Sequence, residues 1–285
     1  PVIGFVIFGL VPMVVSLMLS FTNVKGSILD DFTFVGFANF AYLVKNANFL
    51  KSMRNTLFYL LNVPLSLAVG LFIAYLVNKA GTGNKFFRSV FFIPYVCSTV
   101  SISIAWKIMY DADYGIINTI LGSFGVDKIG WISTPQTFMF SVIIMSVWKG
   151  TGLCIILYQA ALANVNQSYY ESAKIDGASP MRIFFTITLP AVSPTTFYLL
   201  TMKIIGSLQV MEEPDILSGG DETMSGLDWA DMTVVKFLYK TFNGGWNSLG
   251  FGVGSAAALI LTLFILVVTY VNFALGKKWV NYDMA

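Results

Sequence analysis

Long apolar runs alternate with short polar stretches along this chain, and six of the runs are long enough to cross a lipid bilayer. A membrane-spanning helix takes about 20 mostly apolar residues. The runs lie at Val2–Phe21, Thr56–Val77, Val90–Met109, Phe138–Leu162, Thr195–Met211 and Phe251–Leu275. Each run is continuous, whereas strands of a membrane barrel alternate over segments of about ten residues. The pattern predicts an all-α polytopic membrane protein with six transmembrane helices, forming a single domain over residues 1–285.

The composition supports this class and narrows the chemistry. Only 11% of the 285 residues are charged and 56% are hydrophobic, whereas about a quarter of the residues in soluble domains are charged. The chain has no histidine, and Cys97 and Cys154 both fall inside apolar runs, where cysteine acts as a small apolar side chain. The sequence holds no G-x-x-x-x-G-K-[ST] phosphate loop. We therefore expect no catalytic residue, no metal and no cofactor in this chain.

Lysine and arginine indicate the orientation, because short cytoplasmic loops retain positive charge. The loops on one side of the membrane hold seven basic and three acidic residues, and those on the other side hold seven basic and twelve acidic residues. On the first side the basic residues are concentrated in short loops. We therefore expect the polar loop at 163–192 and both termini in the cytoplasm, and the loop at 212–250 outside.

Three lysines lie inside the apolar runs, Lys107, Lys149 and Lys203, and no carboxylate accompanies them. Carriers driven by protons or sodium usually keep an acidic residue at mid-membrane to bind the coupling ion. The pattern disfavours an ion-coupled secondary carrier or channel, which stays open as the alternative hypothesis. Lys107 can extend its amine from the end of its run to the interface. Lys149 lies near the midplane and either lines a substrate path or holds helices together.

The stretch from Glu171 to Pro190 is a polar segment between the fourth and fifth runs. Ser168 and Glu171 have the spacing of a capping box, which starts a helix. Asp176 and Gly177 then suit the end of that helix. Ser179 and Pro180 suit the start of a second helix, which Pro190 would end. The pattern predicts a helical hairpin, which is either a simple connector or a surface presented to a soluble partner.

The order of residues in this hairpin resembles the EAA motif of binding-protein-dependent ABC importer permeases. The matching positions are Glu171, Ala173, Asp176, Gly177, Ala178, Ile187, Leu189 and Pro190. Ser172 replaces the usual first alanine, and Val165 and Asn166 stand where many relatives have Ile-Pro. Other stretches, among them FFRSVFFIPYV from Phe86 and LGFGVGSAAA from Leu249, resemble the subfamily that carries sugars and glycerol phosphates.

This resemblance implies the type I ABC importer permease fold, in which the hairpin is a cytoplasmic coupling helix between the fourth and fifth spans. It implies a subunit of the bacterial inner membrane that forms half of a pore with a second, homologous permease. Two cytoplasmic ATPase subunits would bind ATP and Mg, and an extracellular solute-binding protein would deliver a sugar, expected to be an oligosaccharide. Besides these partners we expect membrane lipid and no nucleic acid. By analogy Glu171 would pair with a basic residue of an ATPase, Gly177 would shape the turn, and Leu189 with Pro190 would join the hairpin to the fifth span.

Polar and aromatic side chains near or within the runs are candidates for the sugar path, because sugars offer hydroxyls to bond and apolar faces to stack. These candidates are Asn62, Trp148, Lys149, Tyr158, Lys203 and Gln209. Each has an alternative, since an amide can bond to a neighbouring helix and an aromatic ring can simply pack. In the predicted outer loop, Trp229–Phe242 has an apolar stripe at helical spacing. The stripe either packs against the chain's own rim or contributes to docking the binding protein.

Overall fold

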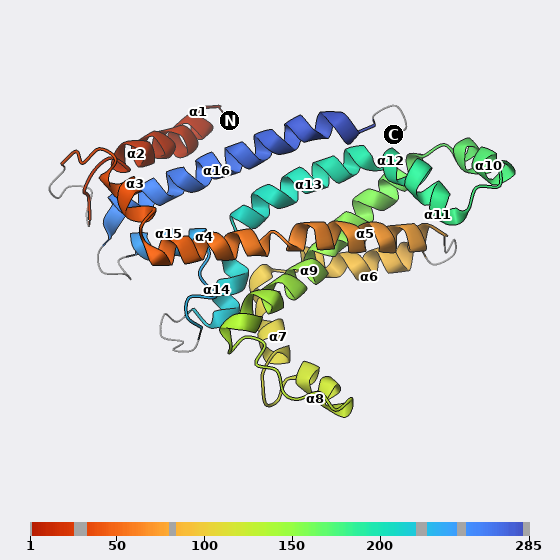
Figure 1. Cartoon of the computed structure of the whole chain (residues 1–285), viewed down its shortest axis with the longest axis horizontal. Helices are drawn as coiled ribbons and strands as arrows, with labels where there is room; N and C mark the ends of the chain where they lie inside the picture. The colour runs from red at the N-terminus through yellow and green to blue at the C-terminus, as the bar shows by residue number, and fades with distance from the viewer. Residues whose placement is uncertain (1, 26–32, 80–83, 221–226, 244–248, 282–285) are drawn as a thin grey trace. The chain divides into compact units, whose positions relative to one another are not determined.

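The structure, a computed structural model, describes residues 2–25, 33–79, 84–220, 227–243 and 249–281. Within these residues the regular structure is helical, apart from an isolated bridge between Thr22 and Phe34. The helices are α1 Val2–Phe5, η1 Val6–Leu10, α2 Val11–Leu19, α3 Ala38–Leu43, α4 Ala47–Tyr59, α5 Asn62–Lys79, α6 Asn84–Val96, α7 Thr99–Met109, α8 Ile116–Ser123, α9 Pro135–Asn164, α10 Gln167–Ile175, α11 Pro180–Ile183, η2 Phe184–Thr188, α12 Leu189–Ala191, α13 Ser193–Leu208, α14 Glu212–Ser218, α15 Val234–Phe242 and α16 Gly250–Trp279 (Figure 1). The predicted all-α class is confirmed. Residues 221–226 and 244–248 of the predicted outer loop lie outside the described residues.

Four helical stretches of the described chain are long and apolar enough to cross a membrane. They are Val2–Leu19, Ala47–Asn78, Pro135–Asn164 and Gly250–Trp279. Two further stretches pass the same test only as bent pairs: Ser89–Val96 with Thr99–Met109, bent by 102°, and Pro180–Ala191 with Ser193–Leu208, bent by 64°. The described residues therefore hold four candidate spans, or up to six if each bent pair is one span.

The run at Val90–Met109 is not one straight helix. α6 ends at Val96 and α7 begins at Thr99. Pro94 cannot donate a backbone hydrogen bond within α6, and Ser98 occupies the position just before α7, where serine is a favoured cap. A count of apolar residues does not register either signal, which is why the break was not predicted.

Two other predicted boundaries shift. The run at Thr56–Val77 is divided between α4 and α5, which begin at Ala47 and Asn62. The run at Thr195–Met211 corresponds to α13, whose bounds are Ser193–Leu208. The helix bounds include polar residues at the ends of the apolar stretches, because backbone hydrogen bonding continues beyond the residues that hydropathy selects.

By its contacts the chain divides into two compact units. The first comprises residues 1–59, 107–140 and 208–267, and the second comprises residues 60–106, 141–207 and 268–285. Each unit is assembled from three separated stretches, so neither corresponds to a continuous segment of sequence. The single domain expected over residues 1–285 stays a prediction.

The core of the first unit gathers α3, α4, α15 and the first half of α16. Its buried side chains include Leu43, Phe49, Phe237 and Ala256, and the rings of Phe49 and Phe237 meet edge to face with centroids 5.5 Å apart. Such aromatic pairs stabilise a core through the apolar area that they bury and through the favourable edge-to-face contact of their rings. The apolar stripe of the predicted outer loop thus packs against its own unit, and its helix begins at Val234 rather than at Trp229.

A buried cation links the segments around α14 and α15 of the first unit. The side chain of Lys236 in α15 is fully buried, and its Nζ lies 2.6 Å from Asp231 and 2.8 Å from Asp215. The same Nζ donates a 3.0 Å hydrogen bond to the hydroxyl of Ser218. A charge removed from water is tolerated when oppositely charged and polar groups surround it. The network links α14, the chain before α15 and α15 itself.

The second unit is packed through close helix contacts. Its core includes Leu67, Leu71, Ile155, Tyr158 and Leu199, contributed by α5, α9 and α13. A side chain at Gly70 of α5 would collide with the Cβ of Cys154 on α9, so glycine sets how closely these helices approach. Figure 1 shows α6 running beside α5, and α10 with α11 following the end of α9. This unit therefore contains the predicted coupling hairpin.

Candidate functional site

The first helix of the hairpin starts earlier than the capping-box spacing predicts. Asn166 occupies the N-cap position, with φ −63° and ψ 124°, and its side-chain oxygen accepts a 3.0 Å hydrogen bond from the N–H of Ser168. The predicted cap at Ser168 is therefore wrong, because asparagine caps helices at least as well as serine and stands two residues earlier. Glu171 lies inside α10 and does not close a capping box.

Gly177 ends α10 as the sequence predicts. Its φ is +69°, in the left-handed region where a side chain is unfavourable. The N–H of Ala178 donates to the carbonyl oxygen of Ala173 at 2.9 Å, and the N–H of Gly177 donates to that of Lys174 at 3.1 Å. This pair of bonds is the Schellman motif. The turn at Gly177 is thus a defined geometry rather than a loose connection.

The second half of the hairpin begins at a cap that the sequence also predicts. The hydroxyl of Ser179 accepts a 3.3 Å hydrogen bond from the N–H of Arg182, and Pro180 is the first residue of α11. The helix continues through the π-helical turn η2 into α12. Pro190 lies inside α12, so the expectation that it ends this helix is wrong. The chain bends at Val192, the C-cap of α12, before α13 begins.

The motif residues divide between a solvent face and a packed face. Glu171, Asp176 and Gly177 are exposed, whereas Ala173, Ala178, Ile187, Leu189 and Pro190 are half-buried. Leu189 packs on the core of the second unit, and the Tyr170 and Thr188 hydroxyls lie 3.3 Å apart, linking α10 to η2. The hairpin is thus held to the body on one side and presents its acidic residues on the other.

Apolar side chains are also exposed on this hairpin. Ile175 is 86% exposed, Met181 68% and Phe185 57%. Met181 and Phe185 lie four residues apart and so share a helix face. Exposed apolar residues beside charged ones are typical of protein-interaction surfaces. Glu171 forms no hydrogen bond or ion pair with any residue that the structure describes, so its carboxylate is available to another chain.

Three of the six candidate path residues are held by other residues within the second unit. The amide nitrogen of Asn62 donates a 3.0 Å hydrogen bond to the hydroxyl of Ser207 on α13, and Tyr158 is 1% exposed within the core. The amine of Lys149 donates to the hydroxyl of Thr99 at the start of α7. For Asn62 and Lys149 the structure therefore shows the helix-bridging arrangement that was left open.

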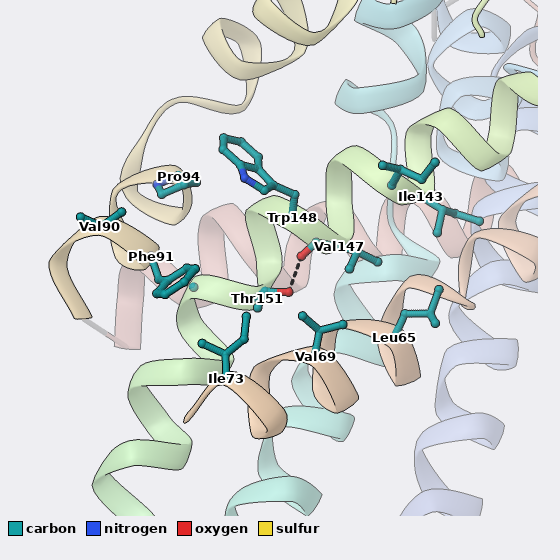
Figure 2. A pocket seen from close by; sticks show the side chains of 12 residues that line it. Leu65, Val69, Ile73, Val90, Phe91, Pro94, Ile143, Val147, Trp148 and Thr151 are labelled. Carbon is teal, nitrogen blue, oxygen red and sulfur yellow. Dashed lines mark hydrogen bonds between the residues drawn. The ribbon is translucent and has the colours of Figure 1, made fainter. Parts of the chain in front are cut away.

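Trp148 lies at a cavity of about 530 Å³ formed by α5, α6 and α9 (Figure 2). The other labelled side chains are apolar, except for Thr151, whose hydroxyl donates to the carbonyl oxygen of Val147 at 2.6 Å. Trp148 is 46% exposed, so its ring is available on this face. The lining offers stacking surface and few hydrogen-bonding groups.

The remaining two candidates, Lys203 and Gln209, belong to different units. The Lys203 amine approaches Gly150, so closely that a Cβ built at Gly150 would lie 2.5 Å from it. Gln209 is exposed just after the end of α13 and belongs to the first unit. The structure therefore brings Lys203 next to the α9 turn that carries Trp148 and Lys149, whereas Gln209 belongs to the other unit.

Comparison with known proteins decides the family. The model of the family described as "binding-protein-dependent transport system inner membrane component" matches residues 66–281, which include the whole hairpin. The chain belongs to this family. The permease is 32% identical, over 99% of its length and 89% of the relative, to a Bacillus subtilis protein described as a probable ABC transporter permease, YesP. It is 31% identical, over 98% of its length and 86% of the relative, to the arabinooligosaccharides transport system permease protein AraP of Bacillus subtilis.

More distant relatives and solved structures agree with this assignment. The permease is 30% identical, over 88% of its length and 82% of the relative, to the trehalose/maltose transport system permease protein MalF of Thermococcus litoralis. It also matches a chain of a bacterial ABC transporter involved in the import of the acidic polysaccharide alginate, with a TM-score of 0.82 and 23% identity over 97% of this chain and 92% of that chain. The predicted ABC importer permease fold is confirmed. Family membership also decides between the two functional hypotheses, in favour of a binding-protein-dependent permease.

Proposed function

We propose that this permease is the sugar-conducting subunit of an ATP-driven oligosaccharide importer and forms half of its translocation pore. A second, homologous permease would supply the other half, and a solute-binding protein would deliver the sugar from outside. Two cytoplasmic ATPase subunits would bind ATP and Mg, so ATP hydrolysis would reside outside this chain. The observation that carries the proposal is the hairpin at α10–α11, in which Gly177 fixes the turn and Glu171 is exposed with no partner among the described residues.

The sugar class is supported by the relatives. AraP is named for arabinooligosaccharides and MalF for trehalose and maltose, and the resemblance to these proteins covers most of this chain. The path through the membrane would use polar and aromatic side chains, of which Trp148, Lys149 and Lys203 lie on neighbouring turns of the second unit. Asn62 and Tyr158 would support these helices from within the unit.

The proposed orientation places the hairpin in the cytoplasm. Lys174 and Arg182 lie on the hairpin, and Lys277 with Lys278 lies in the last turn of α16. Short loops with basic residues are retained on the cytoplasmic side. Both termini would then be cytoplasmic, and α14 and α15 would lie outside.

The coupling step follows from the shape of the hairpin. An ATPase that grips α10 through Glu171 and the exposed apolar residues would move the hairpin as a unit, because the caps at Asn166, Gly177 and Ser179 fix its two helices relative to each other. The motion would pass through η2 and α12 to α13. π-Helical turns recur at functional positions in helices, and here the turn lies directly between the docking surface and the fifth span.

The experiment is uptake by the reconstituted importer. The chain is co-purified with its partner permease and ATPase subunits, placed in proteoliposomes and supplied with its loaded binding protein and radiolabelled arabinotriose or maltotriose. We expect uptake of at least one of these sugars that requires ATP and the binding protein and persists when proton and sodium gradients are collapsed. Uptake that follows an ion gradient without ATP would contradict the proposal.

A further inference from the structure

The first unit contains a pocket that none of the roles above uses. Its volume is about 430 Å³, within the range typical of small-molecule sites. It is formed by three elements: one face of α4, the start of α9, and the turn that precedes α15. The charged, amide and aromatic side chains of its lining that could contact a ligand include Lys51, Arg54, Phe58, Gln136, Asp228 and Trp229. We call it the Arg54 pocket.

The turn that closes this pocket is held in an unusual conformation. Asp228 and Trp229 have φ values of 39° and 67°, although neither is glycine. Such residues persist only where the surrounding structure determines them, and they recur at ligand sites. The side-chain amide of Asn55 fixes this turn, because its nitrogen donates to the carbonyl oxygens of Trp229 at 2.8 Å and of Met232 at 3.0 Å.

The charges in the pocket do not balance. Lys51 forms an ion pair with Asp228 at 2.7 Å, which matches one cation with one anion. Arg54 is exposed and forms no ion pair or hydrogen bond with the part of the chain that the structure describes. The pocket therefore keeps one uncompensated guanidinium, a group whose planar fork suits a carboxylate or a phosphate.

Aromatic surface lies beside this cation. Trp229 lines the pocket, and the rings of Phe58 and Phe140 meet edge to face at its wall with centroids 4.9 Å apart. Aromatic rings stack on the apolar faces of sugar rings, and Gln136, exposed at the start of α9, offers an amide for hydroxyl groups. An acidic sugar carries a carboxylate, apolar ring faces and hydroxyl groups. This cavity offers a guanidinium, aromatic rings and an amide that match those three groups in turn.

We propose that the Arg54 pocket binds a carboxylate-bearing sugar unit of the transported saccharide, with Arg54 on the carboxylate and Trp229 against the sugar ring. The inference rests on the proposed function, in which this end of α4 faces outward. Lys51 and Arg54 precede the apolar run that begins at Thr56, so in the proposed orientation they lie at the outer end of that run. An anionic lipid headgroup could satisfy the same arginine, and the test separates the two.

The test measures binding to the assembled importer in nanodiscs of phosphatidylcholine. Trimers of galacturonate, glucuronate and mannuronate are compared by titration calorimetry with neutral trimers of galactose, glucose and mannose. We expect at least one uronate to bind ten-fold or more tighter than its neutral counterpart. Arg54→Gln should abolish the difference, and Arg54→Lys, which keeps the charge without the fork, should reduce it at least three-fold. Lys45→Gln removes an exposed cation outside the pocket and should leave the difference unchanged.

Three results would overturn the inference. The first is equal affinity for charged and neutral trimers, and the second is a preference that survives both Arg54 variants. The third is a uronate signal that disappears when phosphatidylglycerol replaces part of the phosphatidylcholine. That third result would assign the pocket to lipid headgroups. ATP-dependent uptake of a neutral oligosaccharide without any uronate preference would reject this inference and leave the proposed function intact. Absence of all sugar uptake would instead reject the proposed function.

Discussion

The N–H of Ala178 donates a 2.9 Å hydrogen bond to the carbonyl oxygen of Ala173, and this bond closes α10 around Gly177. The two alanines flank the turn between α10 and α11, so the bond helps to fix the geometry of that turn. Because Gly177 has φ +69°, the closure depends on a residue without a side chain. A mutation can therefore alter the shape of the hairpin as well as its exposed side chains.

Gly177→Ala should weaken coupling. A Cβ at this position meets nothing within 4 Å, so the substitution acts through the backbone alone and should destabilise the turn by about 1 kcal/mol. We expect a partial loss of ATP hydrolysis stimulated by the binding protein in the reconstituted complex. Gly122→Ala in α8 is the matched control, since its Cβ also meets nothing and its φ is not left-handed. Equal effects of the two substitutions would count against a special role for the turn.

Lys236→Met should destabilise the first unit strongly. Removing the amine leaves the carboxylates of Asp231, whose side chain is 10% exposed, and of Asp215, whose side chain is 30% exposed, without their shared cation. Breaking a buried ion pair in this way costs about 3–5 kcal/mol. Lys128→Met is the control, because its ion pair with Asp113 is exposed and such pairs contribute roughly 1 kcal/mol or less. The thermal midpoint of the purified protein should fall clearly for Lys236→Met and little for Lys128→Met. Similar midpoints would show that the network is not a stabilising centre.

The turn after α7 should respond to acid through Asp111. Its carboxylate accepts hydrogen bonds from the N–H groups of Tyr114 at 2.8 Å and Asp113 at 2.9 Å, and these bonds hold the pKa of Asp111 below its ordinary value. A lowered pKa means that the carboxylate stabilises the turn above the ordinary aspartate range. That stabilisation is lost as pH falls through the lowered value.

The measurement is a pH titration of the backbone amide signals of Asp113 and Tyr114 by NMR. Both signals should shift together at a pH below the usual range for aspartate. Asp111→Asn keeps an acceptor oxygen but cannot ionise, and it should remove this step. A step at the ordinary aspartate pH, or one that survives in the variant, would contradict the interpretation.

Much of the fold could be predicted from hydropathy, because burying a backbone in lipid requires long helices. The positions of breaks could not. The bend between α6 and α7 follows from Pro94 and Ser98, which a count of apolar residues treats as minor interruptions. The start of α10 at Gln167 was missed for a related reason, since Asn166 caps the helix two residues before the serine that fitted a known spacing.

The hairpin was easier to predict than the path. Gly177 and Ser179 act locally, so their roles can be inferred from neighbouring residues alone. The partners of Asn62 and Lys149, by contrast, are Ser207 and Thr99, which are distant in sequence. The Arg54 pocket depends on residues near positions 54, 136 and 229, and no local pattern links these three stretches.

The measurement that tests the central claim most directly is ATP hydrolysis by the proposed four-subunit complex, purified and supplied with its sugar-loaded binding protein. Glu171→Gln removes the charge of the exposed carboxylate with little change in size, and a hydrogen bond to a charged group contributes roughly 1.5–3 kcal/mol. Glu212→Gln makes the same change at another exposed glutamate, at the start of α14. We predict that Glu171→Gln lowers the stimulated rate about ten-fold or more and that Glu212→Gln leaves it unchanged. A stimulated rate in Glu171→Gln equal to that of the unmodified complex would contradict the assignment of this hairpin as the coupling site.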